Sequence, residues 1–419
     1  MRTAAIIAEY NPFHNGHQYQ IDKTRRQTGA DFILVLMSGD FVQRGAPALC
    51  SKYIRTKMAL SGGADLVIEL PSLYALSSAE FFAGGAVALL DQLNVVDILS
   101  FGSESGNLSL FEKCTDTIIR HDDEINPLIQ SKLKCGIPFP AARAQAVSEI
   151  LSAGSDAGEL NALFASPNNI LGMEYCKALA ASKSAIRPFT LKREDAGYHN
   201  TSVTAHSSGH ISASAIRNAL DKSPECIAAY VPSTVYQIME ENRLFKDHLD
   251  EDVFSMLLYY KLLTEKEQGF SAYLDCTPDL SDKICKHLSD YTSFTGFCHL
   301  LKTKELTYTR LSRVMMHILL NIRTPEFFRP PFLSRKLHAP YARLLGFKKG
   351  AAPLLSAIKK SSSILLLSKP ADAGSLLSEE ALAMLQQDIF CASVYESAVF
   401  QHTGKLPLNE LKQSPIILP

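Results

Sequence analysis

EYNPFHNGH, residues 9–17, places two histidines on either side of Asn-Gly directly after the apolar run TAAIIA. An apolar run followed by a turn and then by HQYQIDKTRRQTG predicts a first strand that leads into a first helix. His14 and His17 then lie at the helix N-terminus, where free backbone N–H groups favour an anion. Gly16 lets the backbone approach a phosphate closely, and Pro12 stiffens the entry to the turn. The two imidazoles can then donate hydrogen bonds to a triphosphate and stabilise charge as pyrophosphate leaves.

Apolar runs alternate with helical patterns through the first third of the chain. The runs are TAAIIAEY, DFILVLMSG, ADLVIELP and VVDILSFGS, and the helical patterns between them are HQYQIDKTRRQTG, SKYIRTKMALSGG and SAEFFAGGAVALLDQL. Such alternation predicts a Rossmann-like parallel sheet covered by helices on both faces. Ligands bind such a sheet at the carboxyl ends of its strands, where NPFHNGH, SGDFVQRG and FGSESGN all fall. This position favours nucleotide binding over the alternative, a polar turn with two surface histidines.

The hydrophobic pattern of the sequence changes after about residue 220. Strand-like runs give way to long helical patterns such as EDVFSMLLYYKLL and YTRLSRVMMHILLNI. We therefore predict two domains. Residues 1–235 form an α/β nucleotidyltransferase-like catalytic domain, and residues 236–419 form an all-helical domain.

Charge is unevenly distributed, although 42 basic and 43 acidic residues almost cancel over the chain. Residues 221–300 hold 14 acidic and 7 basic residues, whereas residues 301–360 hold 13 basic and 2 acidic ones. Neutralisation of phosphates supplies most non-specific affinity for nucleic acids, so the basic segment favours RNA binding. The aromatic residues of RPPF and APYARLLGF would stack a splayed base. The alternative is a solvated basic face that balances the acidic segment before it.

Cysteine usage and hydropathy indicate a cytoplasmic protein. The nine cysteines are scattered and include no CxxC pair, which is typical of reduced, buried thiols and not of a zinc site. The N-terminus lacks a signal-peptide layout, and no stretch approaches the roughly 20 apolar residues that span a bilayer. We expect no metal site made by the protein itself and no membrane partner.

A second motif, ISASAIR (Ile211–Arg217), follows later in the chain. Ser212 and Ser214 would cap a helix and donate hydroxyls to phosphate, and Arg217 would add a charge-assisted pair. Taken alone, an ordinary helix cap with a solvated arginine explains these residues better. Their order after HNGH favours the second half of a nucleotidyltransferase cleft.

Further charged residues end or follow the predicted strands. Arg193 ends the strand before DAGYH, so its side chain is aimed at the crevice. Arg44, Lys52 and Arg55 either line the cleft or belong to a solvated face. Asp40 and Glu104 either bind magnesium or are ordinary turn residues. Because the sequence contains no P-loop and no Ser/His/Asp layout, we favour attack on an α-phosphate by a bound nucleophile.

Seven blocks occur in a fixed order, and together they carry a family resemblance. They are AEYNPFHNGH, MSGDFVQRGAPAL, KMALSGGADLVIELP, FGSESG, PNNILGMEY, KREDAGYH and SASAIR. In this order they closely resemble the bacterial tRNA(Met) cytidine acetate ligase family, which belongs to the wider HxGH nucleotidyltransferase group. The resemblance is dense over roughly the first 220 residues and fainter over the remainder, where YARLLGFKKG is similar.

The resemblance implies a two-step activity. ATP and acetate form acetyl-adenylate with release of pyrophosphate. The exocyclic amine of the wobble cytidine in elongator tRNA(Met) then attacks the acetyl carbonyl, giving N4-acetylcytidine and AMP. ATP, acetate and this tRNA are therefore the expected partners, with magnesium carried by the ATP and no role for DNA.

The resemblance also implies which residues act. His14, His17 and Arg217 are the expected catalytic residues. The family more often has Asn at the position of Asp40 and Glu at that of Ala46, so neither position has an implied role. The implied ATP-binding residues are Ile7, Ala8, Glu9, Tyr10, Asn11, Pro12, Phe13, His14, Asn15, Gly16, His17, Gln18, Tyr19, Gln20, Gly102, Asn168, Asn169 and Arg193.

Two rival functions remain open. A small-molecule adenylyltransferase would share the nucleotide site, but such enzymes are usually far shorter than 419 residues. A non-catalytic, nucleotide-gated RNA-binding factor would bind ATP or RNA without releasing pyrophosphate in the presence of acetate. Transfer of labelled acetate to tRNA separates both rivals from the ligase.

Overall fold

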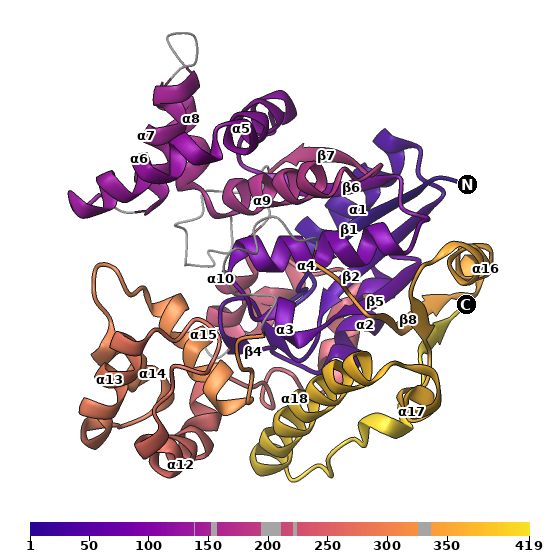
Figure 1. The fold of residues 1–419 in the computed structure, drawn as a ribbon. Coiled ribbons are helices and arrows are strands. Elements are labelled where there is room, and N and C mark those ends of the chain that lie inside the picture. The colour runs from indigo at the N-terminus through magenta and orange to yellow at the C-terminus, as the bar shows by residue number, and fades with distance from the viewer. Residues whose placement is uncertain (138, 152–156, 194–210, 221–223, 326–336) are drawn as a thin grey trace.

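The computed structural model describes residues 1–137, 139–151, 157–193, 211–220, 224–325 and 337–419 (Figure 1). At its centre lies an eight-stranded sheet with the order β10-β8-β5-β2-β1-β6-β7, and β9 pairs with β8. β5, β2, β1, β6 and β7 run parallel, which confirms the predicted Rossmann-like α/β class. The strands are β1 (Thr3–Ala8), β2 (Phe32–Ser38), β5 (Leu66–Leu70), β6 (Ile98–Ser103), β7 (Arg187–Lys192), β8 (Tyr341–Lys348), β9 (Leu365–Leu367) and β10 (Ile416–Leu418).

Both faces of the sheet are buried, because alternate residues of each strand point to opposite sides. In β2, Ile33, Val35 and Met37 join one hydrophobic cluster, whereas Leu34 and Leu36 join the other. The first cluster includes residues of α1 (Asn15–Thr28), α2 (Lys52–Ser61), α10 (Ala213–Leu220) and α11 (Ser233–Glu241). The second includes residues of α3 (Ser72–Ala75), α4 (Ala79–Gln92), α5 (Leu108–Arg120) and α9 (Pro167–Ser182). The near-continuous apolar runs of the sequence reflect this two-sided burial.

The remaining helices form three groups around the sheet (Figure 1). One group, drawn with α5 at the top of the figure, is α6 (Asp122–Lys134), α7 (Phe139–Leu151) and α8 (Ala157–Ala165). A second, at the lower left, is α12 (Ser255–Glu265), α13 (Pro278–Lys286), α14 (Phe294–Leu301) and α15 (Tyr308–Leu319). The third, near the C-terminus, is α16 (Ala352–Ser361), α17 (Ala373–Leu376) and α18 (Glu379–Thr403).

The expectation of an all-helical C-terminal part is wrong, because β8, β9 and β10 belong to the central sheet. β8 runs antiparallel to β5, and β9 and β10 are parallel to β8. β9 and β10 have three residues each, which is too short for a period of two to stand out in the sequence. The boundary at residue 235 stays a prediction, although strands from both sides of it share one sheet.

A buried cluster of ion pairs ties the C-terminal tail to the N-terminal half. Lys52 on α2 pairs with Glu69 of β5 at 2.8 Å, with Asp40 at 3.4 Å and with Glu410. Arg343 of β8 pairs with the same Glu69 at 3.1 Å and with Glu410 at 2.5 Å. Burial opposes ionisation of Glu410, but Lys52 and Arg343 outweigh it and lower the pKa of its carboxyl. The tail is therefore held by charge as well as by the pairing of β10.

We expect replacement of Glu410 by Gln to lower the free energy of unfolding by about 3 kcal/mol, because it leaves two buried cations short of a partner. Urea unfolding of the full chain measures this change. Glu305→Gln is the matched control, because Glu305 is exposed and loses the same charge. Equal free energies of unfolding for the two variants would contradict a stabilising role of the Glu410 carboxylate.

Candidate active site

The turn after β1 lies at the point where the strand order reverses. β2 and β5 follow on one side of β1, and β6 and β7 on the other. Open parallel sheets bind ligands in the crevice at this position, outside the carboxyl ends of the strands. Tyr10 has a φ of 48°, and the Asn11–Pro12 peptide bond is cis. The rings of Tyr10 and Phe13 are buried and contact each other edge-on, with centroids 4.8 Å apart.

Arg55 of α2 holds this turn in place through hydrogen bonds to backbone carbonyls. Its side chain is fully buried and donates hydrogen bonds to the carbonyl of Glu9 at 2.7 Å and to that of Ser38 at 3.0 Å. It also donates to the carbonyls of Gly39 and Cys50. One side chain therefore joins the ends of β1 and β2 to the start of α2.

His14 and His17 form a reciprocal cap at the start of α1. The Nδ1 atom of His14 accepts a hydrogen bond from the backbone N–H of Gly16 at 3.1 Å. The Nδ1 atom of His17 accepts one from the backbone N–H of His14 at 3.2 Å. The two rings stack with centroids 3.7 Å apart. Because each Nδ1 accepts a hydrogen bond, each neutral ring carries its own proton on Nε2 and keeps one N–H donor on the side away from the backbone.

The surroundings of His17 keep its ring neutral. The ring packs edge-on against Tyr10, with centroids 4.8 Å apart, and also faces Phe13. Burial is the largest cause that lowers the pKa of His17 well below 6.5, and any positive charge on the His14 ring, together with that of Arg193, lowers it further. At neutral pH this imidazole is therefore a hydrogen-bond donor without charge.

Two predicted residues from distant segments meet this turn. Arg217 of α10 donates a hydrogen bond to the carbonyl of Asn11 at 2.6 Å. Arg193 follows β7, its N–H donates to the carbonyl of Ser103 at 2.8 Å, and its charge acts on His17. A Cβ atom on Gly102 would lie 3.4 Å from Cγ of Arg193, so the Arg193 side chain lies beside Gly102. The structure thus brings HNGH, Gly102, Arg193 and Arg217 together.

The two serines of ISASAIR have different local roles. Ser212 Oγ accepts a hydrogen bond from the N–H of Ala215 at 3.2 Å, which is the predicted helix cap. Ser214 Oγ accepts one from Arg217 Nη2 at 3.1 Å and so orients the guanidinium. Their contact with phosphate stays a prediction.

Asn168 and Asn169 lie at the N-terminus of α9 and hold the loop that follows β6. Glu104 Oε1 accepts from Asn168 Nδ2 at 2.7 Å, and Glu104 Oε2 accepts from the N–H of Asn169 at 2.9 Å. Asn169 Oδ1 accepts from the N–H of Ser105 at 3.1 Å. The side chain of Asn169 is 2% exposed, so it is placed to shape the loop more than to reach solvent.

The other residues of the predicted ATP-binding stretch are divided between core and surface. Tyr10, Asn11, Pro12 and Phe13 are buried, and Asn15 donates its side-chain amide to the carbonyl of Ala229. Partly exposed residues of the same stretch are Ile7, Ala8, Glu9, Gly16, Gln18, Tyr19 and Gln20. The assignment of the whole stretch to ATP stays a prediction.

The alternative of a solvated face is wrong for Lys52 and Arg55, because both side chains are buried. Lys52 belongs to the ion cluster and Arg55 to the support of the turn, so neither lines the cleft. Arg44 is exposed. The hydrogen bonds by which Arg55 supports the turn were not predicted. The available signal was an arginine set among the apolar residues of KYIRTKMAL, where a buried guanidinium needs carbonyl partners.

The two carboxylates considered for magnesium are already engaged. Asp40 accepts from the backbone N–H of Lys52 at 2.8 Å and pairs with its ammonium, while both oxygens of Glu104 accept from Asn168 and Asn169. No group of three potential metal-binding side chains occurs within the described part of the chain. These residues do not fit a protein-made magnesium site.

The basic segment 301–360 does not form a single surface. Arg343 lies in the buried ion cluster, and Tyr341 of the APYARLLGF motif is buried and donates to Asp388. Lys359 and Lys360 lie on α16, on the opposite side of the molecule from α15 in Figure 1. The RPPF motif lies outside the described residues. The expected stacking role of Tyr341 is therefore wrong, and the charge is divided among the buried ion cluster, α15 and α16.

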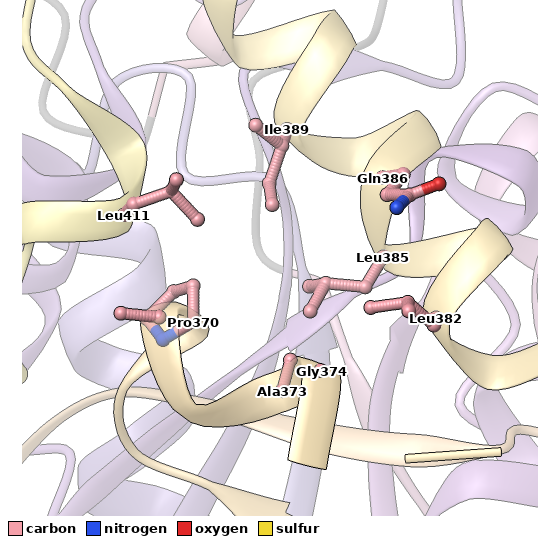
Figure 2. Close-up of a pocket in the computed structure, with 9 residues that line it drawn as sticks. Pro370, Ala373, Gly374, Leu382, Leu385, Gln386, Ile389 and Leu411 are labelled. Atoms are coloured by element: carbon pink, nitrogen blue, oxygen red, sulfur yellow. The ribbon is translucent and has the colours of Figure 1, made fainter. Parts of the chain in front are cut away.

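A hollow of about 340 Å³ lies apart from this site, among C-terminal elements (Figure 2). Its lining is largely apolar and includes Pro370, Ala373, Leu382, Leu385, Ile389 and Leu411. It contains none of the residues predicted to bind nucleotide. Across the described residues, no helix is both long and apolar enough to span a bilayer.

The parallel sheet and the paired histidines at its switch point define a nucleotidyl transferase. The model of the HIGH Nucleotidyl Transferase family matches residues 1–407. Proteins named tRNA(Met) cytidine acetate ligase are similar over most of the chain. The one from Clostridium perfringens is 37% identical over 94% of this chain and 95% of its own, and that from Bacillus velezensis is 36% identical over 99% and 97%. The chain therefore belongs to the tRNA(Met) cytidine acetate ligase family, as the sequence motifs predicted.

Solved structures agree with this assignment. Thermotoga maritima TmcAL in its apo form I has a TM-score of 0.89 and 27% identity, with all of both chains covered. The form II structure of the same protein, bound with alpha-thio ATP, has a TM-score of 0.89 and 26% identity over the same coverage.

We expect the imidazole signals of His17 to stay in the neutral form when pH is lowered through 6.5, the ordinary pKa of histidine. The unfolded chain binds that proton near pH 6.5 and the folded chain does not. The contribution of His17 to the free energy of unfolding is therefore full above pH 6.5 and falls as pH drops toward the lowered pKa. An NMR titration checks this, with His17→Asn used to assign the signals. A midpoint at or above 6.5 would contradict the neutral cap.

Proposed function

We propose that the chain is an ATP-dependent acetate ligase that forms N4-acetylcytidine at the wobble position of elongator tRNA(Met) in the cytoplasm. The observation that carries this proposal is the stacked, reciprocally capped pair His14 and His17 at the start of α1, with Arg193 and Arg217 beside it. The names of the similar proteins support the choice of acetate and of tRNA(Met).

In the first step a carboxylate oxygen of acetate attacks the α-phosphorus of ATP. The bond from that phosphorus to the bridging oxygen of the β-phosphate breaks, and pyrophosphate leaves with the electron pair. Charge therefore grows on the leaving phosphates. Donors that are already oriented toward this charge stabilise the transition state without reorganisation, which is how the Nε2–H groups of His14 and His17 act.

Neutral histidines suit this step because they stay in place throughout it. Protonation of Nδ1 on either ring would remove the acceptor that caps α1, so the fold itself favours the uncharged donors. Positive charge comes instead from the guanidinium groups of Arg193 and Arg217. The four side chains would thus divide the work between orientation and charge.

In the second step the N4 amine of cytidine attacks the acetyl carbonyl. The carbon–oxygen bond to the adenylate breaks, AMP leaves, and the nitrogen loses a proton. Both steps need the nucleotide to stay at the switch point while the RNA base reaches it. Magnesium would arrive with the phosphates of ATP, because Asp40 and Glu104 are engaged elsewhere.

We expect His17→Ala to lower acetate-dependent pyrophosphate release by roughly 10²- to 10³-fold, the usual cost of losing one preorganised donor. Binding of tRNA should stay close to that of the wild type. The assay incubates the full chain with ATP and labelled acetate, with and without tRNA, and measures pyrophosphate and label in RNA. His402→Ala is the matched control, because His402 is exposed near the end of α18.

The outcomes separate the rival functions. Absence of label from tRNA with the wild-type chain would contradict the proposed ligase function. Pyrophosphate release that depends on another small molecule and not on acetate would favour the adenylyltransferase. Binding of ATP and RNA without pyrophosphate would favour the non-catalytic factor. An equal loss of tRNA binding in His17→Ala would mean that the histidine is structural.

A further inference from the structure

A short hairpin from the nucleotide half packs tightly against a helix of the C-terminal half. The hairpin consists of β3 (Phe41–Val42) and β4 (Ala46–Pro47), and the helix is α15. Ser312 Oγ donates a hydrogen bond to the carbonyl of Gly45 at 2.7 Å. Gly45 has a φ of +76°, and a Cβ atom there would lie 2.3 Å from the backbone nitrogen of Arg313. Only glycine allows this approach. The contact between the hairpin, residues 41–47, and α15 forms a seam, and Arg44 lies in the chain next to it.

The seam carries positive charge that the protein balances incompletely. Arg313 is 14% exposed, and its one ion pair among the described residues is with Asp275 at 3.4 Å. Arg310 is partly buried and has no acidic partner within the described part of the chain. The Nε atoms of both arginines are shielded from solvent without a hydrogen-bond partner. Burial and the charge of Arg310 lower the pKa of Arg313, although Asp275 opposes this.

The position of these arginines in the helix adds to the imbalance. α15 begins after the cap Thr307 and has no acidic residue in its first turn, where Arg310 lies. The N-terminal end of a helix carries partial positive charge, and cations are favoured at the opposite end. A buried or half-buried donor without a partner costs free energy unless a ligand supplies the acceptor. These features together call for an anion at the seam.

The seam is also connected to the nucleotide turn. The backbone N–H of Gln43 donates a hydrogen bond to Oε1 of Glu9 at 2.9 Å. Gly45 is two residues further along the same hairpin, which is at most about 7 Å between Cα atoms. An anion held at Arg310 and Arg313 would therefore lie beside the rim of the nucleotide site.

We propose that Arg310 and Arg313, together with Arg44, bind the phosphodiester backbone of the RNA substrate and so fix the RNA against the rim of the nucleotide site. This rests on the proposed function, because it takes RNA to be the second substrate. Guanidinium groups suit the task, since each can donate two parallel hydrogen bonds to one phosphate. A phosphate contact of this kind positions the RNA and leaves the choice of base to other groups. Phosphates of ATP or pyrophosphate are the other source of the same chemistry.

The test compares tRNA binding to the full chain across salt concentrations, by fluorescence anisotropy, for wild type, Arg310→Gln, Arg310→Lys and Lys359→Gln. We expect Arg310→Gln to weaken binding roughly tenfold and to reduce the slope of log K against log salt by about one. Arg310→Lys should keep the slope and lose only a few-fold in affinity, because it retains charge without the fork. Lys359→Gln removes the same charge from α16 and should match the wild type.

Each outcome has a defined meaning. An unchanged salt slope in Arg310→Gln, or an equal change in Lys359→Gln, overturns the proposal. Weaker ATP binding by Arg310→Gln without RNA also overturns it, because the arginine would then serve the nucleotide phosphates. A large loss of stability would mark Arg310 as structural, whereas removal of an unpaired charge should leave the urea midpoint equal or higher. If the wild type neither binds nor labels tRNA, the proposed function itself fails.

Discussion

The fully buried guanidinium of Arg55 is the constraint on which the site depends. A charged group without water must satisfy its donors inside the protein, and this one does so with backbone carbonyls alone. The acceptors belong to Glu9, Ser38, Gly39 and Cys50, which come from the ends of two neighbouring strands and the start of α2. Neither strand end can move without leaving part of the cation unsatisfied. The β1–α1 turn therefore begins from a fixed point.

The histidine pair inherits its geometry from that fixed point. Between Glu9 and His14 the chain buries Tyr10 and Phe13, so the rings form the floor on which His17 packs. The same floor removes water from the His17 ring and lowers its pKa. The packing of His17 on Tyr10 and Phe13 therefore supports the turn, keeps the imidazole neutral and sets the direction of its N–H donor. A more polar floor would loosen all of these together.

The ion cluster extends this support to the far end of the chain. Lys52 lies three residues before Arg55 on α2 and pairs with Glu410 from the tail, while Asp40 accepts from the N–H that begins this helix. A buried pair of this kind contributes little net stability compared with apolar packing, but a missing partner is costly. The cluster therefore acts as a specific lock that places α2, and with it Arg55, relative to β5 and β8.

Much of the fold and part of the site could be predicted from the sequence, for definite physical reasons. β1, β2, β5 and β6 are buried on both faces, so their residues form continuous apolar runs that are visible without a structure. The turn with His14 and His17 was predictable because proline and glycine mark a turn after an apolar strand and because a helical pattern follows directly. β8 was missed because it enters the sheet antiparallel and late, after a long helical region, and pairing over that distance leaves no local pattern. The supporting role of Arg55 could not be predicted because its partners are backbone carbonyls, which every residue has.

The charge of the C-terminal half also shows what a sequence cannot predict, because a count of basic residues does not tell where each one lies. A count over residues 301–360 treats Arg343, Lys359 and Arg310 alike, yet they lie in a buried cluster, on α16 and at the seam with the nucleotide half. Only position decides whether a cation is neutralised, solvated or available to a ligand. Arg343 is balanced by Glu69 and Glu410, whereas Arg310 has no such acid within the described residues. An RNA phosphate would therefore bind the unbalanced positive charge beside the β3–β4 hairpin, and the total charge of the segment does not decide this.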